Sequence, residues 1–156
     1  DDGIWSQVLD LNLTSHQKTL RAATPFLKLG LDPAVIVVGS KNVPAPGPGV
    51  SAYSAAKAGV TQLARVAALE LARDGVRVNV IHPDKVFDTN LWDEDKISAR
   101  AAHYGLTVDE YKRLNLLQVE VRASQVGALA AAMAGPLFAS TTGAQVPIDG
   151  GNDRVI

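Results

Sequence analysis

Three short segments rich in β-branched residues are spaced along this chain, with long helical patterns between them. They are residues 34–38 (AVIVV), 76–81 (VRVNVI) and 145–148 (QVPI). The first is a continuous apolar run, which is typical of a strand buried on both faces in a parallel sheet. Strands that alternate with helices are joined by right-handed crossovers. The pattern therefore predicts an α/β fold with a parallel sheet, and Pro147 places the last strand near an edge.

The helical segments have clear boundaries in the sequence. Apolar residues recur at helical spacing over residues 4–29, 51–73 and 124–134. Ser51 is expected to cap the second of these helices, and Gly75 to end it. Residues 84–122 read as an irregular region with short helices, one of which should start at the capping-box pair Thr107 and Glu110.

A doubly wound, Rossmann-like nucleotide-binding sheet consists of two halves, and its phosphate-binding turn follows the first strand. The chain contains no Gly-x-Gly-x-x-Gly sequence, and three strands account for only one half. It opens on Asp1-Asp2-Gly3, neither a start methionine nor a basic signal region. We expect residues 1–156 to be the C-terminal half of such a domain, cut from a longer protein, with the first nucleotide-binding half absent.

The amino-acid composition of the chain excludes some classes of binding partner. Lys and Arg total 15 against 16 Asp and Glu, which gives a net charge of −1, and there is no cysteine. A protein that neutralises many nucleic-acid phosphates carries a basic excess, and thiolate metal sites or a cysteine nucleophile need cysteine. No apolar run approaches the roughly 18 residues of a membrane span. We expect a cytoplasmic protein with a small-molecule substrate, without a nucleic-acid or membrane partner.

Tyr53 and Lys57 lie four residues apart in the second helical segment, and so on one helix face. A phenol in water ionises only in basic solution, but a nearby cation favours the phenolate and makes the group useful for acid–base chemistry. Alone this pair is a weak signal, because tyrosine and lysine occur at this spacing on many surface helices.

Ser40 strengthens the signal, because it follows the strand at residues 34–38 and precedes Tyr53 by thirteen residues. Ligands of parallel α/β sheets bind at the carboxyl ends of the strands. A serine at this edge can hydrogen-bond the substrate oxygen that Tyr53 protonates or deprotonates. The alternative is that Ser40 only satisfies a loop amide.

Together, Ser40 and the Tyr53-x-x-x-Lys57 motif resemble the catalytic serine and Tyr-x-x-x-Lys signature of the short-chain dehydrogenase/reductase family. The resemblance runs in the right order over nearly the whole chain. Residues 5–12 resemble the family's helix that bears the catalytic asparagine, here Asn12. Residues 76–83 resemble its strand that leads to the nicotinamide loop, and residues 148–151 resemble its final strand and turn.

The resemblance implies roles for these residues and a nicotinamide cofactor, NAD or NADP. Tyr53 is the general acid or base at the substrate oxygen, and Lys57 favours its phenolate form and binds the nicotinamide ribose. Ser40 positions the substrate oxygen, and Asn12 supports a water-linked proton relay. The family commonly forms dimers and tetramers, so a homo-oligomer is expected.

The chain departs from the family pattern after Pro83. The family has glycine at the next position, where this chain has Asp84, so the loop is expected to differ or be strained. The family's threonine near the nicotinamide carboxamide falls on Asp88, one residue before Thr89. Pro83, Val86 and Thr89 are therefore the expected cofactor contacts in this loop.

A narrower resemblance comes from the loops and the C-terminus. Residues 83–88, 100–107, 115–117, 143–147 and 151–154 are similar to the dehydrogenase domain of bifunctional rhamnulose-1-phosphate aldolase/alcohol dehydrogenases. That resemblance implies a sugar-phosphate aldolase domain upstream and its product lactaldehyde as the substrate. Two alternatives stay open: an inactive fragment that serves in oligomer assembly, and a generic ketoacyl or sugar-alcohol reductase of the same family.

The remaining candidates are histidines and aromatic residues. His16, His82 and His103 lack the spacing of paired metal ligands, and we expect no metal site. His82 lies near the predicted site, where a substrate contact is one interpretation and a satisfied loop histidine the other. The aromatic side chains of Trp92, Tyr104 and Tyr111 can line a substrate pocket or cover the core beneath a lid.

Overall fold

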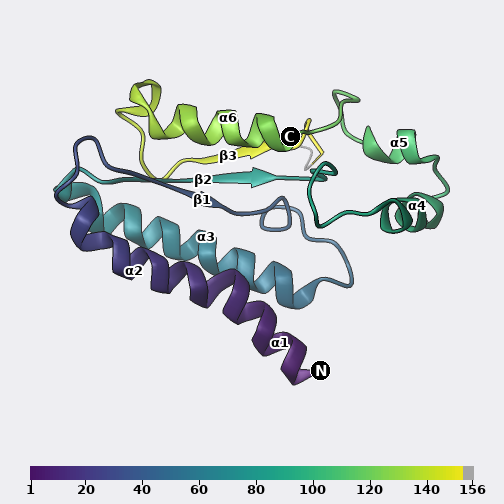
Figure 1. Cartoon of the computed structure of the whole chain (residues 1–156), viewed down its shortest axis with the longest axis horizontal. Coiled ribbons are helices and arrows are strands. Elements are labelled where there is room, and N and C mark those ends of the chain that lie inside the picture. The colour runs from purple at the N-terminus through teal and green to yellow at the C-terminus, as the bar shows by residue number, and fades with distance from the viewer. Residues whose placement is uncertain (153–156) are drawn as a thin grey trace.

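The computed structural model of the chain describes residues 1–152 and has one parallel sheet. Its strands are β1 (Ala34–Val38), β2 (Arg77–Pro83) and β3 (Gln145–Ile148), in the spatial order β1-β2-β3. Val37 is paired with Val80, and Ile81 with Val146. The predicted α/β fold with a parallel sheet is confirmed (Figure 1).

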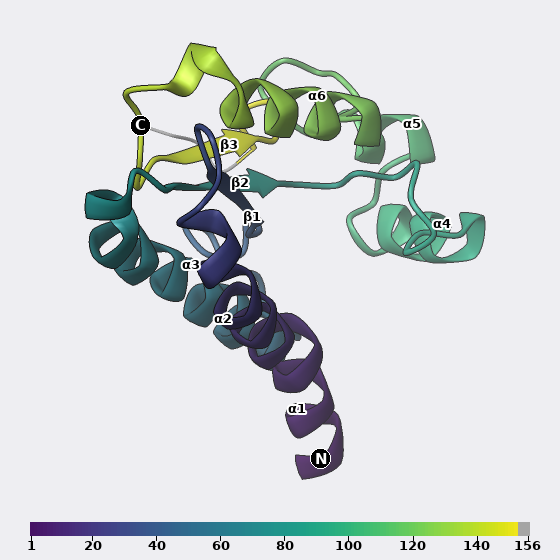
Figure 2. The same ribbon diagram turned by 60° about the vertical axis from the view of Figure 1, so that its left-hand side comes forward.

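Helices cover both faces of the sheet. Helices α2 (Ser15–Leu27) and α3 (Ser51–Leu71) lie on one face, and α6 (Ala123–Ala134) lies on the other (Figures 1 and 2). The short helices α4 (Glu94–His103) and α5 (Val108–Lys112) lie beyond the ends to which the strand arrows point. The carboxyl ends of the strands, where ligands of such sheets bind, therefore face the irregular region.

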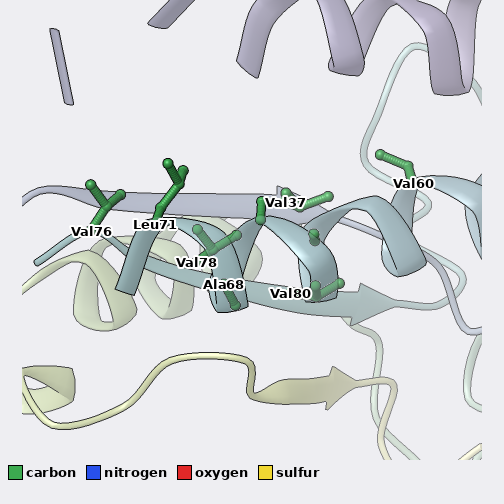
Figure 3. Packing of buried hydrophobic residues seen from close by; sticks show 9 residues of the cluster. Val37, Val60, Ala68, Leu71, Val76, Val78 and Val80 are labelled. Atoms are coloured by element: carbon green, nitrogen blue, oxygen red, sulfur yellow. The ribbon is translucent and has the colours of Figure 1, made fainter. Parts of the chain in front are cut away.

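The main core lies between α3 and the sheet. Strand β2 is central, and all but its last residue are buried. Figure 3 shows Val78 and Val80 of this strand beside Leu71 and Ala68 of α3. Alanine-rich turns of α3 allow the helix to pack closely on the valines, which fixes the part of α3 that carries the candidate side chains.

The N-terminal helix is less regular than predicted. Residues 4–29 were expected to form one helix, and the structure has α1 (Asp2–Leu9), a π-helical turn η1 (Asp10–Thr14) and then α2. The wider turn is closed by a hydrogen bond from the Ser15 amide to the Asp10 carbonyl. Such π-bulges insert one residue into a helix and are frequent at functional sites. Hydrophobic periodicity does not reveal them.

The boundaries of α3 differ from the prediction at one end. Ser51 was expected as the N-cap, but it is the first helical residue, and Val50 occupies the cap without a side-chain hydrogen bond. At the other end the helix tightens into η2 (Ala72–Asp74), and Gly75 follows with a left-handed φ of 75°. That backbone conformation favours glycine, as predicted.

Strand β1 is an edge strand in the described part of the chain. It was expected to be buried on both faces, yet Val37 is its only fully buried residue and the Val38 side chain is 45% exposed. Within residues 1–152, β1 has a neighbour only on the β2 side. An apolar groove of about 510 Å³ runs along it and is lined by residues that include Leu20, Val35 and Leu63.

Other expectations for the fold are confirmed. Thr107 and Glu110 form the predicted capping box at the start of α5. Strand β3, which contains Pro147, is the outer strand on its side of the described sheet.

No helix among residues 1–152 combines the length and apolar character needed to cross a bilayer. Asp153 and Arg154, used in the narrower resemblance, lie outside the described residues.

Buried polar residues of β2 hold the C-terminal segment. The Arg77 guanidinium donates to the Met133 and Ala134 carbonyls, both at 2.8 Å, and to the Phe138 carbonyl at 3.2 Å. It thus caps the end of α6 and binds η3 (Pro136–Phe138). The side chain of Asn79 donates to the Thr141 carbonyl and accepts the Ala144 amide, both at 2.9 Å. These contacts set the path from α6 into β3.

Replacing Arg77 is expected to lower the stability of the protein substantially. Arg77→Met removes three hydrogen bonds from a charged donor and leaves carbonyls unpaired, which should lower the free energy of unfolding by about 3 kcal/mol. Urea denaturation measures the change. Arg73→Met, on the exposed side of η2, is the control and should stay within about 0.5 kcal/mol of wild type. Equal stability of the two variants would contradict this role of Arg77.

Candidate active site

The carboxyl end of β1 and the first turns of α3 meet through Lys57. Its ammonium donates a hydrogen bond to the Val38 carbonyl at 3.0 Å, two residues before Ser40. This contact spans nineteen residues of sequence. The structure therefore brings the predicted lysine to the strand end that carries the predicted serine.

Tyr53 lies on the same face of α3 as Lys57. The Lys57 Nζ atom is 5.7 Å from the centroid of the Tyr53 ring, and the tyrosine side chain is half-buried. A cation at this distance over a tyrosine ring is attracted to the face of the ring. The arrangement can accept a proton from an alcohol or return one to a carbonyl oxygen.

Lys57 is a buried cation whose charge stays unneutralised among the described residues. Its side chain is 7% exposed, and no carboxylate of residues 1–152 forms an ion pair with it. Burial lowers the pKa of Lys57, because the charged form is poorly solvated there. An ammonium has three donors, so two remain for other groups after the Val38 contact. A buried cation without an ion pair is a candidate for a binding or catalytic role.

The Ser40 hydroxyl accepts one hydrogen bond and still has its proton available. Its oxygen accepts a hydrogen bond from the Asn42 amide at 3.1 Å, so the serine does satisfy a loop amide. A hydroxyl that accepts one bond still has one proton to donate. Both interpretations of Ser40 from the sequence are thus compatible, and its O–H can donate to a substrate oxygen.

Asn12 lies in the middle of the π-helical turn. Its side-chain amide donates to the Val8 carbonyl at 3.1 Å. The next residue, Leu13, packs against α3 so closely that a Cβ at Gly59 would lie 3.0 Å from its Cδ2 atom. Gly59 is two residues after Lys57, so the packing holds η1 beside the lysine segment.

The charge of Lys57 also affects α2. Burial lowers the pKa of His16, and the positive charge of Lys57 lowers it further. His16 follows Asn12 by one helical turn, and its Nδ1 atom lies 3.2 Å from the Ser15 hydroxyl. The N-terminal helix, the end of β1 and α3 thus converge around the lysine.

The turn after β2 is strained, as the sequence predicts, but at the residue after Asp84. Asp84, which replaces the family's glycine, does not have a left-handed backbone; Lys85 does, with φ of 47°. A lysine in this conformation costs about 1 kcal/mol. Asp84 accepts a hydrogen bond from the side chain of Asn152, and the Lys85 ammonium donates to the Leu114 carbonyl at 3.3 Å. The strained backbone therefore lies at Lys85 and not at Asp84, and the side chains of both residues stabilise the turn through hydrogen bonds.

The three expected cofactor contacts lie in the segment that begins with the last residue of β2. Pro83 is the last residue of β2, and its carbonyl accepts the Lys41 amide at 3.1 Å. The Thr89 hydroxyl donates to the Val86 carbonyl at 3.0 Å, so its proton is used within the turn. Asp88, at the family's threonine position, accepts the amide of Ala123 at 2.9 Å. It therefore stabilises the start of α6, a contact across 35 residues that sequence reasoning missed.

The aromatic residues form a small core of their own. The Phe87 ring lies 5.0 Å from that of Trp92 and 5.6 Å from that of Tyr111, between ring centroids. Tyr104 stacks on Tyr111 at 5.8 Å, and Ile97 of α4 joins the cluster. The cluster holds α4 and α5 together beyond the strand ends.

His82 lies inside the structure at 3% exposure. One ring nitrogen faces the backbone of Ser40 and the other faces Gln145. The interpretation as a satisfied histidine is therefore the better one, although its partner is the candidate catalytic serine.

Comparison with known proteins identifies a family. The sequence profile of a family described as "Enoyl-(Acyl carrier protein) reductase" matches residues 1–153. The chain is 33% identical over 152 residues to D-beta-hydroxybutyrate dehydrogenase of Rhizobium meliloti, covering 94% of this chain and 58% of that protein. It is 35% identical over 123 residues to the uncharacterized oxidoreductase YuxG of Bacillus subtilis, covering 76% of this chain and 18% of that protein.

A solved structure agrees with the sequence comparison. The NADPH-bound structure of a short chain oxidoreductase with an atypical catalytic center from Pseudomonas aeruginosa superposes with a TM-score of 0.82 at 32% identity. The match covers 97% of this chain and 58% of that one. The chain thus spans less than two thirds of the length of the proteins it matches.

Proposed function

The chain belongs to the short-chain dehydrogenase/reductase family, and its three-stranded sheet matches the C-terminal part of the family's Rossmann fold. On this basis we propose that the full-length protein is an NAD(P)-dependent oxidoreductase that interconverts an alcohol and a carbonyl. The observation that carries the proposal is the buried Lys57, unpaired with any described carboxylate, between Tyr53 and the end of β1.

The chain's own residues manage the proton and the substrate oxygen. In the direction of oxidation, Tyr53 as phenolate accepts the hydroxyl proton of the alcohol, and in reduction it returns a proton to the carbonyl oxygen. Ser40 donates its free O–H to the same oxygen and fixes its position. Lys57 favours the phenolate through its charge, and Asn12 supports proton exchange with water from the π-helical turn.

The residues present fit the nicotinamide side of the cofactor. Lys57 has two donors left for ribose hydroxyls, and Tyr53, Pro83, Val86 and Thr89 complete the proposed contacts. The bound nicotinamide supplies the chemistry of hydride acceptance or donation. The amide cradle for the pyrophosphate would come from a Gly-rich turn that this sequence does not contain, so we assign it to the rest of the protein.

For the substrate we propose a small hydroxy-aldehyde or its alcohol, with lactaldehyde as the leading candidate. The support is the resemblance of the loop and C-terminal segments to bifunctional rhamnulose-1-phosphate aldolase/alcohol dehydrogenases. The match to YuxG also supports an additional domain in the full-length protein, because about four fifths of YuxG lie outside the match. An aldolase domain upstream would deliver lactaldehyde to this site.

A substrate screen of the full-length protein tests this function. Purified protein is assayed with NAD and NADP against lactaldehyde, 3-hydroxybutyrate, a ketoacyl thioester and sugar alcohols, in both directions. We expect turnover that is fastest with lactaldehyde and strongly favours one cofactor. Preference for a ketoacyl or sugar-alcohol substrate would support a generic reductase, and no turnover with any of them would support an assembly role.

The open edge of β1 predicts how residues 1–156 behave alone. Without the pyrophosphate cradle, most of the cofactor affinity should be missing, and the apolar groove beside β1 should be covered by a second copy. We expect an oligomer in analytical ultracentrifugation and a dissociation constant for NAD or NADP weaker than about 1 mM by calorimetry. Micromolar binding, about −8 kcal/mol, would show that the cofactor site is misplaced.

A further inference from the structure

His82 of the central strand β2 contacts both the candidate catalytic serine after β1 and the neighbouring strand β3. Its Nδ1 atom lies 3.2 Å from the Ser40 amide nitrogen and 3.0 Å from the Ser40 carbonyl oxygen. Its Nε2 atom lies 3.0 Å from Oε1 of Gln145 on β3. One imidazole thus connects the loop after β1, the end of β2 and the start of β3.

The hydrogen bonds select one tautomer of the ring. The Ser40 carbonyl already accepts the Val43 amide at 3.0 Å, whereas the Ser40 amide has His82 Nδ1 as its acceptor. If the Gln145 oxygen accepts from Nε2–H, the lone pair on Nδ1 is directed to the Ser40 amide. This is the tautomer in which the buried Ser40 amide has an acceptor.

The packing around the His82 ring leaves room for its contact with the Ser40 backbone only when residue 39 has no side chain. A Cβ at Gly39 would lie 2.6 Å from His82 Nδ1 and 2.8 Å from Cε1, too close for a side chain. The residue before Ser40 must therefore be glycine for the ring to reach the serine backbone. The amides of Gly39 and Lys41 bind the Ile81 and Pro83 carbonyls at 2.8 and 3.1 Å, so the backbone is held on both sides of Ser40.

We propose that His82 is a positioning residue for Ser40: with Nε2 bound to Gln145 and Nδ1 facing the Ser40 amide, it fixes the Ser40 peptide so that the hydroxyl donates to the substrate oxygen. This inference rests on the proposed oxidoreductase function. It goes beyond that function because His82 acts through the serine and contacts neither substrate nor cofactor. Displacing a catalytic group by about 1 Å can lower a rate up to about 100-fold.

Two polar substitutions of His82 in the full-length protein distinguish a role in positioning Ser40 from a role in filling space. The amide group of His82→Asn can occupy the place of Nδ1 and accept the Ser40 amide, whereas that of His82→Gln extends toward the place of Nε2. We expect His82→Asn to keep kcat within about threefold of wild type and His82→Gln to lower kcat about 30-fold, with a smaller change in KM. A wild-type kcat in His82→Gln would overturn the proposal.

A double-mutant cycle with Ser40→Ala tests whether the effect passes through the serine. If His82 acts by placing the Ser40 hydroxyl, His82→Gln should change kcat by less than about twofold in the Ser40→Ala background. A structural role would lower kcat by the same factor in both backgrounds, and that result would contradict the proposal.

Gln145 offers a variant that leaves the buried ring in place. Its side chain is exposed, so Gln145→Leu should fold, yet the ring loses the hydrogen-bond partner of Nε2 that holds its orientation. We expect kcat to fall about fivefold and the peptide containing Ser40 to exchange its amide hydrogens faster, in Gln145→Leu and in His82→Gln. If the wild-type protein turns over no substrate, the oxidoreductase function fails, and hydrogen exchange still decides the His82 contact. Unchanged exchange in both variants would overturn the contact.

Discussion

Tyr53→Phe in the full-length protein is expected to lower kcat by about 10²- to 10⁴-fold, which is the usual cost of losing a general acid or base. The substitution keeps the aromatic ring and removes the hydroxyl that exchanges the proton with substrate. The folded structure should be nearly unaffected, because no hydrogen bond of the described residues depends on this hydroxyl. Steady-state kinetics with the best substrate from the screen measures the loss.

Tyr104→Phe is the matched control for that experiment. It also deletes one tyrosine hydroxyl, but Tyr104 is 53% exposed and contacts Tyr111 through its ring face. Its activity should stay within about twofold of wild type. Activity of Tyr53→Phe within about threefold of wild type would mean that another group carries the proton.

Lys57→Met is expected to affect activity and stability in opposite directions. The change removes the charge that favours the Tyr53 phenolate and the donors proposed for the ribose, so kcat/KM should fall by about 10²- to 10³-fold. It also replaces a buried, unpaired ammonium by an apolar side chain of similar length. At pH 7 the variant should therefore unfold at a higher denaturant concentration than wild type.

The stability difference should depend on pH, because burial lowers the pKa of Lys57 below its value in the unfolded chain. Below the lowered pKa the lysine is charged in both states, and the folded state carries the full cost of burying the charge. As pH rises through the folded pKa toward the unfolded value, the cost disappears. The advantage of Lys57→Met should therefore shrink at alkaline pH.

Denaturation series from pH 7 to about pH 10 measure this dependence. Lys18→Met, at an exposed position of α2, is the control and should show no such trend. A variant that is less stable than wild type at pH 7 would show that Lys57 has a structural role that outweighs its desolvation.

The sequence was sufficient to predict the features that depend on local patterns. The bounds of β1 and β3, the glycine end of the α3 segment and the capping box at Thr107 follow from residue type and spacing, and the structure confirms them. The proximity of Lys57 to the end of β1 follows from the general rule that functional residues gather at the carboxyl edge of a parallel sheet.

The features that sequence reasoning missed depend on contacts between distant segments. The bond from His82 to Ser40 spans 42 residues, and those from Arg77 to the end of α6 and to η3 span 56 to 61. Neither has a periodicity that could reveal it. The π-helical turn at Asn12 was missed for another reason, because the apolar residues of segment 4–29 were read as one continuous α-helix.

Transfer of a deuterium label tests the central claim, hydride exchange between an alcohol and a nicotinamide cofactor, most directly. The full-length protein is given the alcohol identified by the screen, deuterated at its carbinol carbon, with the preferred oxidised cofactor. Mass spectrometry then determines where the deuterium is found. We predict that it appears in the reduced nicotinamide, while the hydroxyl proton leaves through Tyr53 to solvent. A reduced cofactor without deuterium, or a carbonyl product formed without cofactor reduction, would contradict the assignment.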